Sequence, residues 1–173
     1  SLVAMAQGAP IEAIHQPDAT DTAVLLYTSG TTGKPKGAEL THSNLLLNCA
    51  VVVPRLIPID SSQVALAALP LFHSFGQTCI QNATIAAGGS FTLLPRFTPE
   101  DALRIIERDR VTIFAGVPTM YFGLLQTPAA EKHDFSSVRY CMTGGAAMPV
   151  DVMRAFEERY PVKILEGFGL SET

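Results

Sequence analysis

The sequence predicts an α/β fold, a three-layer sandwich around a mainly parallel β-sheet. Short apolar runs alternate with helix-length segments almost throughout the chain. Strands separated by ten or more residues of helix pair in parallel through right-handed crossovers. Apolar residues make up 47% of the 173 residues and charged residues 16%, which is typical of a sheet buried on both faces. We therefore expect a single α/β domain over residues 1–173.

The first half of the chain is expected to contain four strands and two helices. The strands are predicted at residues 23–27, 37–40, 64–69 and 90–94. The first helix begins at a cap, Thr41 or Ser43, and ends near Val53 because Pro54 follows. The second helix covers residues 75–87 and stops at two glycines. The first two strands could form a local hairpin around the loop between them.

The second half alternates three helices with three strands. The best-marked helix begins at Thr98, which is followed by a proline and two acidic residues near the positive helix end. Its buried stripe is Ala102, Leu103, Ile105 and Ile106, and Glu100 is spaced to pair with Arg104. The remaining strands are predicted at 111–115, 139–143 and 163–165, and the remaining helices at 118–125 and 149–160.

Composition excludes several classes of protein. A net charge of −4 gives no basic surface for nucleic acid. The longest apolar stretch, 45–57, is interrupted by polar residues and proline, so no transmembrane segment is expected. Three widely spaced cysteines show no pairing or metal pattern and are expected to be reduced thiols in a cytoplasmic protein. Both ends of the sequence suggest a piece of a longer protein.

The most informative segment is residues 27–37, Tyr-Thr-Ser-Gly-Thr-Thr-Gly-Lys-Pro-Lys-Gly. Its glycines permit a turn with exposed N–H groups, and its hydroxyls and lysines add donors and positive charge, which suits a polyphosphate. It is not a Walker A loop, because Pro35 follows Lys34, where that motif needs a serine or threonine. The glycine spacing of a dinucleotide fingerprint is also absent. An ordinary Gly/Thr-rich surface hairpin is the alternative.

Two further glycine-rich segments follow predicted strands. Residues 144–147 come after the strand at 139–143, and residues 166–173 come after the strand at 163–165. Because ligands bind beyond the carboxyl ends of parallel strands, we expect both segments and the loop at 27–37 to share one edge and one site. Alone, residues 144–147 could be a tight strand-to-helix connection. Likewise, Phe168 and Glu172 could be a core phenylalanine and a solvated acid.

The segment at 27–37 resembles the signature loop of the adenylate-forming superfamily, which includes acyl-CoA synthetases, adenylation domains of peptide synthetases and luciferases. All eleven positions fit the pattern Tyr/Phe-Thr-Ser-Gly-Ser/Thr-Thr-Gly-x-Pro-Lys-Gly. The resemblance implies that the chain is part of the large N-terminal domain of such an enzyme. In that family the substrate's carboxylate attacks the α-phosphate of ATP, giving an acyl-adenylate and pyrophosphate.

The resemblance also implies which residues act. The expected cofactor-binding residues are Thr28, Ser29, Gly30, Thr31, Thr32, Gly33, Lys34, Lys36, Gly37, Gly144, Gly145, Ala146, Glu166, Gly167, Phe168, Gly169 and Ser171. The residues with roles in catalysis are Thr28, Lys36, His73 and Glu172.

Within that set, Lys36 and the hydroxyls of 28–32 cradle the β- and γ-phosphates, whereas the family tolerates many residues at Lys34. Residues 144–146 line the adenine pocket. Phe168 stacks on adenine, Ser171 bonds the α-phosphate and Glu172 holds Mg²⁺.

The segment 166–173 departs from the family pattern Gly-Tyr-Gly-x-Thr-Glu twice. Phe168 replaces tyrosine and Ser171 replaces threonine, so only a bond from the tyrosine hydroxyl is lost. His73, in Leu-Pro-Leu-Phe-His-Ser-Phe-Gly at 69–76, resembles a gate residue near the acyl carboxylate. Residues 117–121 resemble an acyl-pocket segment, although they could equally be simple core.

The resemblance implies ATP, coenzyme A and a small-molecule carboxylic acid as substrates. The acid is expected to be a medium- or long-chain fatty acid, because the segments at 69–125, with their apolar pocket residues, look most like that branch of the family. An aryl or amino acid, or a nucleotide-binding module without catalysis, is the alternative. The family's later motifs are absent, including the catalytic lysine of its C-terminal domain, so we expect little activity. A truncated sheet edge could cause non-native association, and a lipid substrate could place the protein at a membrane surface.

Overall fold

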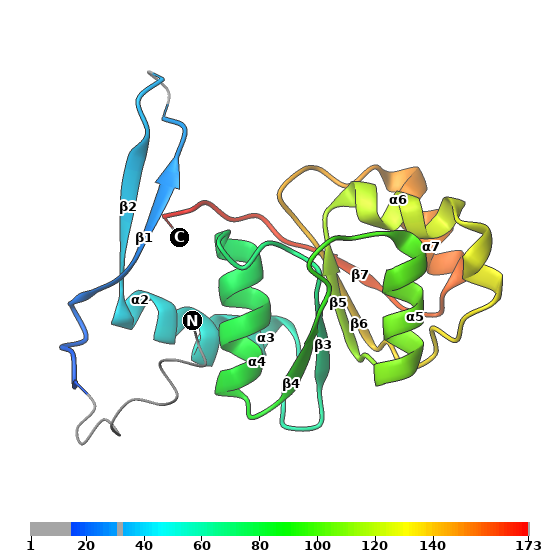
Figure 1. Cartoon of the computed structure of the whole chain (residues 1–173), viewed down its shortest axis with the longest axis horizontal. Helices are drawn as coiled ribbons and strands as arrows, with labels where there is room; N and C mark the ends of the chain where they lie inside the picture. Colours follow the sequence, from blue (N-terminus) through cyan, green and yellow to red (C-terminus); the bar gives the residue numbers. More distant parts are fainter. Residues whose placement is uncertain (1–14, 31–32, 173) are drawn as a thin grey trace, which may run out of the picture.

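The computed structural model describes residues 15–30 and 33–172, with the backbone alone at Val52. Two separate sheets organise this part of the chain (Figure 1). The first is an antiparallel hairpin of β1 (Thr22–Thr28) and β2 (Lys36–Thr41). Of the predicted site residues, Thr31 and Thr32 lie outside the described residues.

The second sheet has five parallel strands in the order β4-β3-β5-β6-β7. The strands are β3 (Val64–Ala67), β4 (Ser90–Leu93), β5 (Ile113–Gly116), β6 (Tyr140–Thr143) and β7 (Ile164–Glu166). The chain leaves β3 for β4 at one edge and then returns past β3 to continue from β5 to β7. A parallel sheet with this reversal has its natural ligand crevice beyond the carboxyl ends of the strands.

Helices cover both faces of the parallel sheet, which confirms the three-layer prediction (Figure 1). One face packs on α5 (Pro99–Asp109), α6 (Pro118–Gln126), the short 3₁₀ turn η3 (Pro128–Glu131) and α7 (Val150–Arg159). The other side holds α2 (His42–Leu47), α3 (Val53–Leu56), α4 (Ala83–Ala86) and two π-helical segments, η1 (Asn48–Val52) and η2 (Phe75–Asn82). Successive strand residues alternate between the two cores, as Phe114 and Ala115 do.

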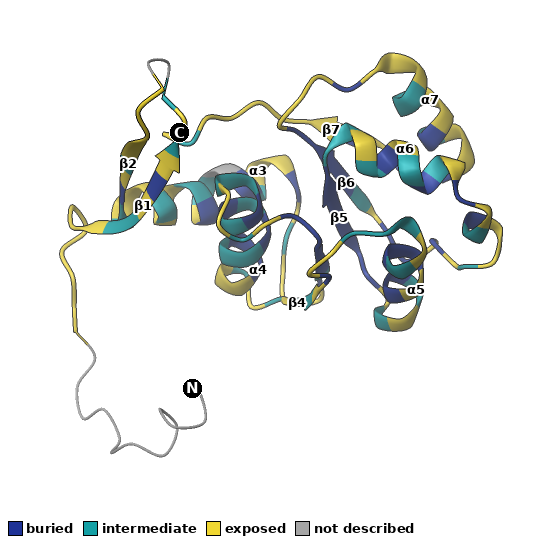
Figure 2. Cartoon of the chain, turned by 45° about the horizontal axis from the view of Figure 1, so that its top comes forward, coloured by how far each residue is buried: buried dark blue, intermediate teal, exposed yellow. Residues whose placement is uncertain are grey.

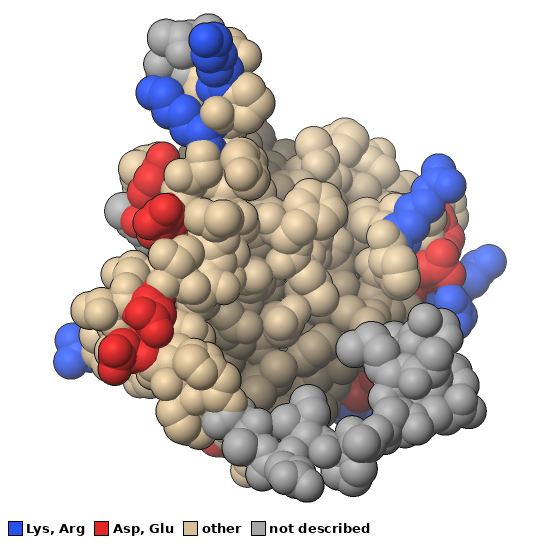
Figure 3. Space-filling model, turned by 60° about the vertical axis from the view of Figure 1, so that its left-hand side comes forward, with Lys and Arg blue, Asp and Glu red and all other residues tan. Residues whose placement is uncertain are grey.

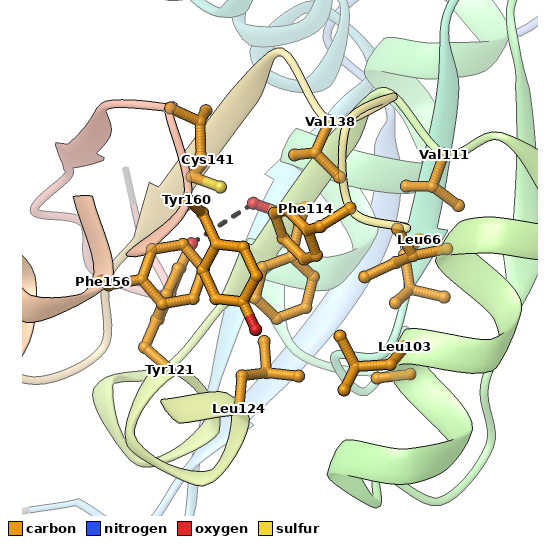
Figure 4. Close-up of a cluster of buried hydrophobic side chains, with 14 of the residues drawn as sticks. Leu66, Leu103, Val111, Phe114, Tyr121, Leu124, Val138, Cys141, Phe156 and Tyr160 are labelled. Carbon is orange, nitrogen blue, oxygen red and sulfur yellow. Dashed lines mark hydrogen bonds between the residues drawn. The ribbon is translucent and has the colours of Figure 1, made fainter. Parts of the chain in front are cut away.

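The larger core is centred on aromatic rings between β5, α6 and α7 (Figure 4). The Tyr121 ring meets Phe114 and Phe156 edge-to-face, with ring centroids 5.1 and 4.9 Å apart. Its buried hydroxyl donates to the carbonyl of Met142 at 2.6 Å and lies 3.3 Å from that of Phe114. Desolvation raises the pKa of Tyr121 well above its usual value, so the ring stays a neutral donor that joins α6 to two central strands.

The helix α5 follows the sequence prediction closely but pairs its charges differently. Thr98 caps it by accepting from the Asp101 N–H, and the four predicted apolar residues are buried. The predicted pair of Glu100 with Arg104 is wrong, because Arg104 bonds Asp101 at 2.7 Å. Glu100 instead accepts from the Thr127 hydroxyl at 2.6 Å, which ties α5 to the end of α6.

The prediction that the first helix ends at Pro54 is also wrong. Thr41 caps the helix as expected, and the helical course continues through η1 into α3, which ends at Leu56. The N–H of Val53 donates to the carbonyl of Asn48, five residues back. A π turn is wider than an α turn, and it accommodates the ring and missing N–H of Pro54 without ending the helix.

Burial divides the described chain into two parts. Buried residues concentrate in β3, β5, β6 and the helices packed on them, whereas the hairpin and the segment after β7 are largely exposed (Figure 2). All three cysteines are free thiols, as predicted. Within residues 15–30 and 33–172, no helix combines the length and apolar character needed to cross a membrane.

Candidate functional site

A cavity of about 520 Å³ lies at the carboxyl ends of β6 and β7. One wall comes from the helical stretch α2–η1–α3 and includes Leu45, Asn48, Val53 and Leu56. The facing wall is the start of η2, and the floor and rim are the loops after β6 and β7. Two predicted glycine-rich segments therefore meet at one cavity, as the parallel topology required.

The floor of the cavity depends on a close approach of two backbone segments and the Phe75 ring. The Gly167 N–H donates to the Thr143 carbonyl at 2.8 Å. A Cβ atom on Gly144 would lie 3.0 Å from the Gly167 carbonyl oxygen and 3.3 Å from a ring carbon of Phe75. Glycine at 144 therefore lets the loops after β6 and β7 pack against the first turn of η2, and it leaves a flat surface there.

Glu166, predicted to bind the nucleotide, has a contact that the sequence did not reveal. Its carboxylate accepts from the Met148 N–H at 2.8 Å. This bond holds the loop after β6 against the end of β7 and so fixes the position of Gly144 and Gly145. Its predicted role as a ligand to the nucleotide stays a prediction.

The segment after β7 carries the predicted nucleotide contacts along the rim of the cavity. It runs from β7 across to the β1–β2 hairpin (Figure 1). Phe168 is 92% exposed, so a bare aromatic face is presented to solvent. Ser171 is half-buried and Glu172 is exposed, and both line the cavity. A polar and an aromatic side chain are thus available on the same short segment.

His73 lies on a tight turn, two residues before η2 begins at Phe75. Its N–H donates to the Pro70 carbonyl at 3.1 Å, and its Nδ1 accepts from the Phe75 N–H at 3.2 Å. With Nδ1 acting as acceptor, the neutral ring carries its proton on Nε2. The turn needs glycine at 76, where a Cβ would lie 2.4 Å from the Pro70 carbonyl oxygen. His73 lines the cavity, as its prediction as a pocket-wall residue requires.

The predicted phosphate loop is carried by the hairpin rather than by the parallel sheet. Thr28 ends β1 and pairs with Lys36, which begins β2. A connection of seven residues can close an antiparallel pair, whereas a parallel pair needs a crossover of a dozen or more. The prediction that this loop shares the sheet edge is therefore wrong, and none of its described residues lines the cavity. The segment after β7 ends beside β1 in both ribbon views (Figures 1 and 2).

The loop conformation itself depends on glycine. Gly30 and Gly33 have φ values of 65° and 78°, in the left-handed region. A Cβ on Gly30 would also lie 2.2 Å from the Lys34 carbonyl oxygen. Lys34, Lys36 and Gly37 are exposed. Lysine side chains lie at the projecting tip of the hairpin, with acidic side chains just below them and uncharged surface beside those (Figure 3).

The cavity itself has little charge. Its ionisable lining residues within the described part of the chain are His73, Cys79 and Glu172. Burial and, to a smaller extent, the neighbouring Cys49 raise the pKa of Cys79 to about 11, so this thiol is neutral near pH 7. The wall formed by α2, η1 and α3 was missed by the sequence analysis. Asn44 and Asn48, four residues apart on one helix face, were the signal that could have indicated it.

Comparisons with known proteins agree on one family. The model of the family described as AMP-binding enzyme matches residues 3–173. The chain is 42% identical over 153 residues to a long-chain-fatty-acid–CoA ligase of Bacillus subtilis, covering 88% of this chain and 27% of that protein. It is 40% identical over 154 residues to a feruloyl-CoA synthase of Amycolatopsis, covering 88% and 30%.

A solved structure gives the same result. The crystal structure of ATP-bound MatB from Rhodopseudomonas palustris superposes with a TM-score of 0.88 at 34% identity, covering 99% of this chain and 34% of that one. The chain thus spans about a third or less of the length of these three proteins.

Proposed function

Because the chain belongs to the AMP-binding enzyme family, which its match over residues 3–173 shows, we propose that the protein activates a carboxylic acid with ATP and transfers the acyl group to coenzyme A. The observation that carries the proposal is the meeting of Gly144, Gly167 and Phe168 at the rim of one apolar cavity. The acid–CoA ligases among its relatives support it.

The nucleotide would bind at the rim of the cavity. The loop 144–146 supplies a surface on which adenine can lie, and the exposed ring of Phe168 can stack on the base. Ser171 would bond the α-phosphate. Hydroxyls and N–H groups of 28–30, with Lys34 and Lys36, would hold the β- and γ-phosphates, and the cluster of positive charge at the hairpin tip favours that role (Figure 3).

The reaction needs positioning and charge neutralisation rather than a protein nucleophile. A carboxylate oxygen of the acid forms a bond to the α-phosphorus as the bond to the pyrophosphate oxygen breaks. The thiolate sulfur of coenzyme A then attacks the acyl carbon, and AMP leaves. His73, which lines the cavity, would orient the acid's carboxylate before the first step.

Glu172 would hold Mg²⁺. Its carboxylate is exposed at the cavity rim, and no cluster of three metal-binding side chains exists among the described residues. A single carboxylate fits Mg²⁺, which usually keeps several waters and binds through one or two carboxylates and substrate phosphates. When bound, the ion would neutralise phosphate charge.

The acid is proposed to be a fatty acid. The cavity walls are largely apolar, and the similarity to the Bacillus subtilis ligase supports a long chain. The similarity to a feruloyl-CoA synthase favours an aryl acid as the second candidate. We expect slow turnover by these 173 residues alone, because they correspond to a third or less of the relatives' lengths. Free thiols support a cytoplasmic location.

The proposal is tested by titrating ATP into the protein and its Lys36→Met variant by calorimetry. We expect the variant to bind ATP at least about tenfold more weakly, which corresponds to about 1.4 kcal/mol. Lys132→Met, at an exposed lysine after η3, is the matched control and should bind normally. Mass spectrometry should detect acyl-adenylate when decanoate and ATP are mixed with the protein. Absence of ATP binding by the unaltered protein would contradict the proposal.

A further inference from the structure

The two helical walls of the cavity share an unusual local geometry. The segments η1 and η2 are both π-helical and pack against each other. The Cys49 thiol contacts the Thr78 carbonyl oxygen at 3.8 Å, which joins the two segments. π-Helical turns are rare, and they occur frequently at functional sites. Here one cavity has a π-helical segment in each of two facing walls.

Each π-helical segment contributes one polar side chain to the cavity lining. Asn48 begins η1 and Thr78 lies in the middle of η2, and both line the cavity. Most neighbouring wall positions are apolar or weakly polar, including Leu45, Val53 and Cys79, and the other polar side chains on these walls are Asn44 and Ser74 at the helix starts and His73. Asn48 and Thr78 therefore add polar groups to a largely apolar wall. A purely hydrocarbon acyl chain would gain nothing from such groups.

These two side chains are not used by the fold. Within residues 15–30 and 33–172, no hydrogen bond involves the Asn48 amide or the Thr78 hydroxyl. The nearby Asn44 is different, because its Oδ1 accepts from the Thr41 N–H at 2.9 Å and from the Thr41 hydroxyl at 2.9 Å. Asn44 is thus explained by the helix cap, whereas Asn48 and Thr78 have no structural role of this kind.

The chemistry of the ligand that fills the cavity determines whether these two polar groups keep hydrogen-bond partners, and so whether binding is penalised. A hydrocarbon group would exclude water from the amide and the hydroxyl and leave them unpaired, which is unfavourable. A ligand with an oxygen atom at that depth would accept from the amide or exchange a hydrogen bond with the hydroxyl. Sites built to bond a substrate hydroxyl discriminate strongly against the analogue that lacks it.

We propose that Asn48 and Thr78 form a polar notch that selects acids whose acyl group carries an oxygen substituent. The substituent would be a hydroxyl, an ether oxygen or a carbonyl, on either an aryl acid or a fatty acid. This inference rests on the proposed function, because it assumes that the cavity holds the acyl group. The two residues are specificity-determining and take no part in the bond-forming steps.

The test compares matched pairs of acids by calorimetry with the 173-residue chain saturated with AMP. The first pair is cinnamate and 4-hydroxycinnamate, and the second is decanoate and 10-hydroxydecanoate. We expect the oxygenated member of at least one pair to bind about tenfold more tightly than its parent. The pair that shows the preference identifies the source of the substituent, aryl or aliphatic.

Three variants assign the preference to the notch. Asn48→Leu and Thr78→Val keep side-chain size and remove the polar atoms, so each should abolish the preference, and the parent acid should bind at least as tightly as it does to the unaltered chain. Asn82→Leu changes the end of η2 at a residue outside the cavity lining and should keep the preference. Thermal unfolding checks that each variant is folded.

The outcomes separate the notch from the proposed function. If AMP and the parent acids bind without any preference for the oxygenated members, the notch is refuted and the proposed function stands. Equal losses for both members of a pair in Asn48→Leu and Thr78→Val would also refute it. If neither AMP nor any acid binds the unaltered chain, both proposals fail.

Discussion

Two regions of the molecule differ in how much of their side-chain surface is buried. The first is the parallel sheet with α5–α7, and the second is the β1–β2 hairpin with the segment after β7. Phe114, Tyr121 and Phe156 in the first region are 0% exposed, whereas Tyr27 and Phe168 in the second are 73% and 92% exposed. Aromatic side chains in the first region pack on one another (Figure 4). In the second region, the segment after β7 is exposed along most of its length (Figure 2). Packing and the predicted phosphate contacts are therefore separated along the chain.

This separation indicates how the site would operate. The packed region positions the cavity floor, since Gly144 and Gly167 follow directly from β6 and β7. The exposed region carries Lys34, Lys36, Phe168 and Glu172. It buries little apolar surface of its own. Regions with few buried contacts open at low free-energy cost. We expect ligand binding to order the exposed region and to leave the packed region unchanged.

The largest effect is expected from Phe156→Ala, measured by urea unfolding. Phe156 is 0% exposed and meets Tyr121 and Tyr160 at centroid distances of 4.9 and 4.7 Å. Truncating a core phenylalanine typically costs about 3–5 kcal/mol of unfolding free energy. Phe168→Ala is the matched control and should change that free energy by less than about 0.5 kcal/mol. Similar losses of unfolding free energy in the two variants would show that the two regions contribute equally to stability, contrary to this comparison.

A smaller effect is expected from Gly30→Ala, measured as ATP affinity. Alanine would be strained at a φ of 65°, and its Cβ would collide with the Lys34 carbonyl oxygen. We expect ATP binding to weaken about tenfold, or about 1.4 kcal/mol, with little change in unfolding free energy.

Gly88→Ala provides the matched control, because Gly88 also has a left-handed φ, of 73°, but lies outside the candidate site. A Cβ at position 88 would make ordinary contact, at 3.6 Å, with the Ser61 Cβ, so ATP affinity should be retained. A loss of global stability in Gly30→Ala comparable with that of Phe156→Ala would show that the hairpin supports the fold, contrary to the comparison.

The smallest effect is expected on thermal stability when the pH is lowered, through protonation of Asp134 in the packed region. Hydrogen bonds from Ser136, and then from Arg110, lower the pKa of Asp134 from 3.8 to about 2. A carboxylate with a lowered folded-state pKa stabilises the fold above its unfolded pKa. That contribution is lost as the pH falls from about 4 through about 2.

Thermal unfolding between pH 5 and pH 2 measures this contribution. The melting temperature of Asp134→Asn should fall less between pH 5 and pH 2 than that of the unaltered protein. The difference will be small because the Asp134 carboxylate is exposed. An identical pH dependence in the two proteins would show that Asp134 contributes nothing to stability.

Local rules predicted most of the elements. Thr98 with its proline and acids identified the start of α5, and the glycines at 88 and 89 identified the end of the helix at 75–86. The alternation of strands and helices predicted the parallel sheet, and the resemblance to the adenylate-forming superfamily is confirmed by the family match. These signals are local because caps, stops and periodicity act within a few residues.

The errors concern partners that the sequence does not specify. Arg104 can reach either Glu100 or Asp101, and the choice follows from the Thr127 hydroxyl, 27 residues away, which bonds Glu100. Pro54 continues a helix because the preceding turn widens. Glu166 bonds the Met148 N–H, which comes near only when β7 pairs beside β6.

The pattern of residues was sufficient to establish the strand and helix order, the glycine-rich loops and the family, because these depend on local backbone preferences and on an eleven-residue match. The arrangement of the site required the folded chain. Parallel pairing brings the loops after β6 and β7 together, whereas a connection of seven residues closes β1 and β2 into their own hairpin. The wall with Asn48 and Thr78 likewise exists only because η1 and η2 pack against each other beside the cavity, and such long-range contacts leave no local signal in a single sequence.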